Sequence, residues 1–154
     1  MFKATAILRF DPKHSHSKFR SWWACADVPW SVGNYYRYWV KRELGIHLNT
    51  PCWKEHVSVV RGEEPKKPWN WKKREGQKVT IFYSHEIKMN DTYAWLSVES
   101  KELEEIRVEL GLSPTPKVAY HLTFGNCKNV VNKTPKAVPF KVVFPWELPH
   151  YFKQ

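Results

Sequence analysis

Apolar and polar positions alternate along two stretches of the chain that each carry a histidine. Residues 118–124 read Val-Ala-Tyr-His-Leu-Thr-Phe, with Val, Tyr, Leu and Phe on one side and Ala, His and Thr on the other. The same period of two runs through residues 53–60, where His56 and Ser58 alternate with valines. This period is typical of a half-buried strand. Both stretches are therefore predicted to be strands.

On each of these strands, the histidine and a hydroxyl residue share one face. Residues two apart on a strand point the same way and lie roughly 6.5 Å apart. His121 and Thr123 therefore project together, as do His56 and Ser58. Two His-x-(Ser/Thr) strands indicate an active site with two imidazoles and two hydroxyls, suited to a phosphodiester. For either motif alone, a strand histidine with a structural hydrogen bond is the simpler interpretation.

The same patterning predicts further strands and three helices. The strands are expected at residues 2–10, 78–84, 93–98 and 140–144. Strand 2–10 is apolar on both faces and is expected to be central. The helices are expected at residues 18–26, at 31–44 with Ser31 as N-cap, and between Ser100 as N-cap and Gly111.

Each half of the chain then contains a strand, helical material and a His-x-hydroxyl strand. This order predicts a single domain over residues 1–154, with an α+β fold of two pseudo-symmetric lobes. Prolines and charges between residues 61 and 76 predict a long loop.

Charge and aromatic content add a candidate ligand. The chain has 25 Lys+Arg against 15 Asp+Glu, a net charge of +10, which attracts polyanions. Trp69 and Trp71 stand among lysines in the long loop, and this combination predicts a lid whose indole rings stack on a base. The alternative is that the two rings fold back and form a small core of the loop itself. Arg61, Tyr83 and Glu147 are weaker candidates for substrate contacts.

Cysteine usage and hydropathy indicate the compartment. The three cysteines form no CxxC motif, which favours reduced thiols over a disulfide framework or a zinc site. No apolar run approaches the roughly 20 residues of a membrane span, and the start lacks the layout of a signal peptide. His14 and His16 lack accompanying ligands and are interpreted as a solvated loop. We therefore expect a cytoplasmic protein with no metal, no cofactor and no membrane partner; its oligomeric state is left open.

The segments His56-Val57-Ser58-Val59 and His121-Leu122-Thr123-Phe124 resemble the paired motifs of the two-histidine (2H) phosphoesterase superfamily, the LigT-like fold. The resemblance covers the two motifs, their separation and the surrounding order of elements. It implies a bilobal fold in which two antiparallel sheets flank a central cleft with helices outside. It also implies metal-independent phosphodiester chemistry on nucleotides or RNA ends.

In this chemistry, one imidazole deprotonates the attacking water or 2′-hydroxyl and the other protonates the leaving oxygen. Ser58 and Thr123 would hydrogen-bond the non-bridging oxygens. Which histidine is the base stays open. The chain size and the aromatic loop are most similar to viral and phage members, including anti-CBASS nucleases that act in the host cytoplasm.

The leading hypothesis is thus a hydrolase that cleaves a cyclic or 2′-5′-linked (oligo)nucleotide signal. The alternatives are an RNA end-processing 2′,3′-cyclic phosphodiesterase or ligase-like enzyme, and a non-catalytic nucleotide- or RNA-binding protein.

Overall fold

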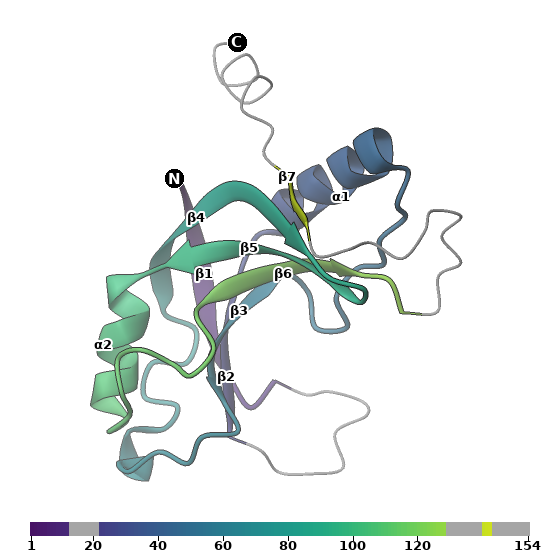
Figure 1. Cartoon of the computed structure of the whole chain (residues 1–154). Coiled ribbons are helices and arrows are strands. Elements are labelled where there is room, and N and C mark those ends of the chain that lie inside the picture. Colours follow the sequence, from purple (N-terminus) through teal and green to yellow (C-terminus); the bar gives the residue numbers. More distant parts are fainter. Residues whose placement is uncertain (13–21, 129–139, 143–154) are drawn as a thin grey trace.

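The strands of the protein form one closed antiparallel barrel (Figure 1). The structure, a computed structural model, describes residues 1–12, 22–128 and 140–142. The six strands of the ring follow the order β1-β2-β3-β6-β5-β4, and β1 pairs with β4 to close it. Their bounds are β1 Phe2–Phe10, β2 Trp23–Asp27, β3 His56–Arg61, β4 Lys78–Met89, β5 Tyr93–Glu99 and β6 His121–Asn126. A short strand β7, Phe140–Val142, pairs with the second half of β4.

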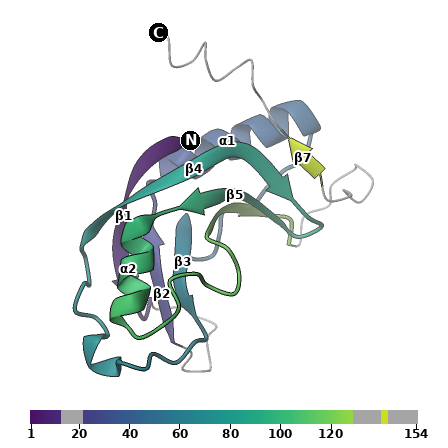
Figure 2. The ribbon, with the colours of Figure 1, turned by 60° about the vertical axis from the view of Figure 1, so that its left-hand side comes forward.

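Two α-helices lie on different sides of the barrel (Figures 1 and 2). Helix α1, Trp30–Leu44, buries Tyr36, Trp39 and Val40 in the core and contacts β6. Helix α2, Lys101–Glu109, contacts β3 and β4. Neither helix is long and apolar enough to cross a membrane.

The expectation of a bilobal α+β fold with two sheets is wrong. All the described strands belong to one sheet, so there are no separate lobes and no cleft between two sheets. The halves are joined because β1 pairs with both β2 and β4, so β1 has no free edge, although in a closed ring no strand is central. The expected helix at 18–26 is also wrong over its second half, where residues 23–27 form β2 and link β1 to β3.

Local signals account for one end of each helix. Ser100 accepts a hydrogen bond from the backbone N–H of Leu103 at 3.3 Å, which confirms it as the N-cap of α2. Gly45 follows α1 with φ of 65°, a left-handed conformation that glycine adopts without steric cost. The predicted cap at Ser31 is wrong, because α1 starts one residue earlier, after Pro29.

The long loop is confirmed between β3 and β4, with one short 3₁₀ helix, η1, at Pro68–Asn70. It is fastened to the C-terminal end of α2: the backbone N–H of Lys67 donates to the Leu110 carbonyl at 3.0 Å, and Asn70 donates to the Glu109 carbonyl at 2.7 Å.

Candidate active site

The two His-x-hydroxyl strands are direct neighbours in the barrel. β3 and β6 pair antiparallel, with His56 opposite Thr123 and Val57 opposite Leu122. Continuing this register places Ser58 opposite His121. Val57 and Leu122 are fully buried, whereas the two histidines and two hydroxyl residues are only half-buried. All four motif side chains therefore lie on the outward face of the sheet.

The two histidines form the diagonal of this four-residue square. Diagonal positions on paired strands are about 7–8 Å apart. An acid and a base each need to approach their proton partner to about 2.6–3.2 Å. The two imidazoles therefore start from strand positions close enough for one phosphate to lie within reach of both rings.

Backbone carbonyls fix the orientation of both imidazoles. His56 Nδ1 lies 2.7 Å from the carbonyl oxygen of Trp53 and 2.9 Å from that of Lys54. His121 Nδ1 lies 2.9 Å from the carbonyl oxygen of Ala119. A carbonyl oxygen only accepts, so Nδ1 carries the hydrogen in both rings. The neutral tautomer thus leaves Nε2 of each ring as the proton-accepting atom.

A buried ion pair holds the motif strands against α1. Arg37 of α1 is paired with Glu55, the buried residue just before His56, and also donates to the carbonyl of Phe124 at 2.6 Å. Gly33 makes this approach feasible, because a Cβ there would lie 2.4 Å from Glu55 Cγ. Arg37 therefore contacts the residue just before β3 and a residue of β6, which are the chain neighbours of His56 and Thr123.

The same outward face continues onto the neighbouring strands. On β2, Asp27 stands opposite His56 and accepts hydrogen bonds from Arg9 Nε at 3.2 Å and Trp53 Nε1 at 2.9 Å. On β5, Trp95 stands opposite Thr123 and Ser97 opposite His121.

A pocket of about 400 Å³ adjoins the His121 side of this face. Strands β4, β5 and β6 and the segment before β6 line it. Its polar and aromatic lining includes Lys88, Tyr93, Trp95, Ser97, His121 and Thr123. It offers room for a small molecule beside the second motif.

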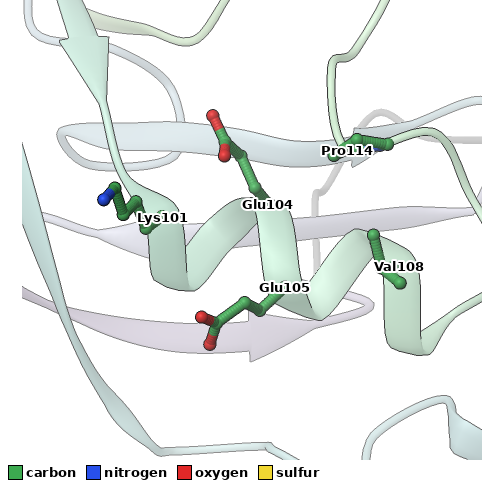
Figure 3. A pocket seen from close by; sticks show the side chains of 5 residues that line it. All are labelled: Lys101, Glu104, Glu105, Val108 and Pro114. Carbon is green, nitrogen blue, oxygen red and sulfur yellow. The ribbon is translucent and has the colours of Figure 1, made fainter.

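Another hollow, of about 370 Å³, lies on α2 and has the opposite character (Figure 3). Glu104 and Glu105 contribute two carboxylates there against the single ammonium of Lys101. A phosphate would be repelled by this lining.

Arg61, predicted from its place after the first motif, does lie on the motif face. The pairing of β2 with β3 shifts by one residue, so that Ser58 pairs with Cys25 but Val60 with Ala24. This β-bulge turns Arg61 to the same side as Ser58. Its guanidinium stacks 4.1 Å from the centre of the Trp23 ring, which in turn lies 5.7 Å from the His56 ring.

The other predicted substrate residues are not brought to the histidines by any described contact. The Trp71 ring packs 4.9 Å from both Phe10 and Trp22, which lie outside the loop, so Trp71 packs against the barrel core and does not form a separate core of the loop. Trp69 is 68% exposed in the same loop. Tyr83 contacts Phe2 and Tyr36. Glu147 lies outside the described residues.

The pocket residues Lys88, Trp95 and Ser97 were missed by the sequence reasoning. A signal was available, because Trp95-Leu96-Ser97 repeats the alternation of the motif strands, with Leu96 buried. In residues 1–12, 22–128 and 140–142, no three His, Cys, Asp or Glu side chains are grouped to hold a metal ion.

Comparisons with family models, with curated proteins and with solved structures each gave no match to this chain. The 2H resemblance therefore stays a prediction from the motifs, and the functional argument depends on the geometry of the site.

Proposed function

We propose that the protein is a phosphodiesterase in which His56 and His121 act as a general acid–base pair on a nucleotide phosphodiester. The observation that supports this most is the β3–β6 register, which puts both His-x-hydroxyl pairs on one outward face. Both rings also hold Nδ1–H against carbonyls and keep Nε2 for proton transfer.

In the proposed reaction, one imidazole takes a proton from the attacking water or 2′-hydroxyl as the new P–O bond forms. The other, protonated, donates its proton to the leaving oxygen as the old P–O bond breaks. Ser58 and Thr123 donate hydrogen bonds to the non-bridging oxygens, where negative charge increases. The scheme balances protons without any further group.

The pocket beside His121 has room for a small nucleotide, which supports a nucleotide substrate. A cyclic or 2′-5′-linked oligonucleotide signal is the proposed substrate. The same pocket also suits the last nucleotide of an RNA with a 2′,3′-cyclic phosphate, which is the second candidate. All three cysteines are free thiols, which suits a reducing cytoplasm. If the protein is viral, this compartment is the cytoplasm of the host cell.

The test is turnover of a panel of cyclic dinucleotides and trinucleotides, 2′-5′-linked oligonucleotides and RNA ending in a 2′,3′-cyclic phosphate, all in EDTA. We expect hydrolysis of at least one signal nucleotide, with His56→Ala and His121→Ala each lowering kcat about 10²–10⁴-fold. His47→Ala, an exposed histidine outside the motif strands, is the matched control.

Activity that survives both histidine substitutions, or that EDTA abolishes, would contradict the proposal. Cleavage confined to the RNA ends would select the second candidate. Binding without turnover in the wild type, unchanged in both histidine variants, would identify a nucleotide-binding protein.

A further inference from the structure

Lys88 and Ser97 form a polar pair inside the pocket. Lys88 Nζ donates a hydrogen bond to Ser97 Oγ at 2.8 Å. An ammonium group has only donors, so the Ser97 oxygen accepts and its own hydrogen remains to be donated elsewhere. Ser97 stands directly opposite His121 in the register of β5 and β6. The pocket therefore holds a cation and an oriented hydroxyl donor next to a motif histidine.

Trp95 supplies an aromatic surface in the same pocket. It is half-buried. In the sheet it stands opposite Thr123 of β6 and opposite Lys88 of β4, the two strands that flank β5. Tyr93, two residues earlier on β5, lines the pocket as well. Aromatic rings in such positions stack on bases without regard to sequence. A cation and an indole on adjacent strands match the phosphate and the base of one nucleotide.

The pocket size limits how much of a substrate it can hold. At about 400 Å³ it lies near the lower end of small-molecule sites, which span about 300–1,000 Å³. This volume suits a single nucleotide.

From these positions we propose that the pocket is a one-nucleotide subsite, in which the Lys88–Ser97 pair binds phosphate oxygens and Trp95 stacks on the base. The inference rests on the proposed function and specifies its substrate: a diester with one nucleotide seated between β4 and β6 and the reacting phosphorus beside His121. It also places base stacking on β5 instead of on the loop that carries Trp69 and Trp71.

The test is isothermal titration of the wild-type protein with AMP, adenosine and inorganic phosphate at low salt. Lys88→Gln removes a charge-assisted hydrogen bond and should weaken AMP binding about tenfold while leaving adenosine binding unchanged. Trp95→Ala should weaken AMP and adenosine alike, by about 5- to 100-fold. Lys101→Gln, in the acidic hollow of Figure 3, and Trp69→Ala are the controls, and both should bind AMP like the wild type.

Two conservative variants separate binding from folding. Lys88→Arg and Trp95→Phe should retain most of the AMP affinity, and thermal melts should show all variants folded. The inference is overturned if AMP does not bind the wild type at millimolar concentration, if neither Lys88→Gln nor Trp95→Ala changes its affinity, or if Trp69→Ala removes it.

The result is distinguishable from that of the phosphodiesterase test. AMP binding that depends on Lys88 and Trp95, with no diester cleaved, would support the subsite and contradict the proposed reaction. If a diester is cleaved and neither Lys88→Gln nor Trp95→Ala changes kcat/KM, the result would support the reaction and contradict the subsite.

Discussion

Arg107 of α2 has a fully buried side chain that reaches the end of β3, where the carboxylate of Glu63 neutralises its charge. The guanidinium donates to both carboxylate oxygens of Glu63 at 2.9 Å and to the Val59 carbonyl, also at 2.9 Å. Val59 lies at the bulge between Ser58 and Arg61. A single charged pair therefore fixes the end of the first motif strand.

This pair predicts an acid-dependent loss of stability. The hydrogen bonds from Arg107 lower the pKa of Glu63 below its ordinary value. In the folded state Glu63 thus binds fewer protons than in the unfolded chain, so it stabilises the fold above the ordinary glutamate pKa of about 4.3. That contribution is lost as the pH falls through the lowered value.

We expect Glu63→Gln to melt at a lower temperature than the wild type at pH 7, because Arg107 then lacks its counter-charge. The gap should narrow as the pH falls below about 4.3. Glu64→Gln, the exposed neighbour, controls for loss of one carboxylate. Melting temperatures measured from pH 7 to pH 2.5 test this, and a gap that stays constant over that range would contradict it.

Among the elements, α1 determines how β3 and β6 meet. Arg37 bridges Glu55, which directly precedes β3, and the Phe124 carbonyl of β6, so one side chain ties together the chain neighbours of His56 and Thr123. The side chains of Arg37 and Glu55 are 12% and 4% exposed, so removing one partner leaves a buried charge.

Arg37→Met is expected to lower the free energy of unfolding by about 3–5 kcal/mol, measured by urea denaturation. Arg42→Met, on the exposed side of α1, should change it by at most about 1 kcal/mol, because Arg42 loses exposed contacts such as that with the Trp39 ring. The double variant Arg37→Met/Glu55→Met should recover much of the loss, because no buried charge remains unpaired. Equal losses in the single variants at 37 and 42 would show that the bridge does not stabilise the strand pair.

The elements were predictable from sequence where local patterns decide them. Alternation identified β3 and β6, and Ser100 marked the start of α2. Residues 23–26, which belong to β2, were mistaken for part of a helix because a short apolar run has no clear period, and there tertiary pairing decides.

Strand partners could not be predicted in the same way. The pairing of β3 with β6 joins residues far apart in the chain, and barrel closure depends on contacts between β1 and β4. The lobed fold was inferred from the element order and from the resemblance of the two motifs, neither of which specifies strand partners, so it failed where these long-range contacts decide. Lys88, Trp95 and Ser97 look like ordinary strand residues until the register of three strands brings them beside His121.

At the scale of the whole molecule, the net charge of +10 attracts anions over distances longer than a direct contact. The loop between β3 and β4 carries Lys66, Lys67 and Lys73, all exposed, while its position is fixed by α2 and by the packing of Trp71. The lid hypothesis would have these lysines touch the substrate. The proposed subsite instead leaves them only a long-range attraction, which salt screens over about 10 Å at 0.1 M.

The triple variant Lys66→Gln/Lys67→Gln/Lys73→Gln separates these two roles. For any diester cleaved by the proposed phosphodiesterase activity, we expect kcat/KM of the triple variant to fall severalfold at low salt, because the basic field attracts the anion, while kcat stays unchanged. At about 0.5 M NaCl the variant and the wild type should have equal kcat/KM, since screening removes the long-range term. Steady-state rates across a salt series provide the measurement. A fall in kcat, or a deficit in kcat/KM that persists at high salt, would mean that the loop contacts the substrate as a lid.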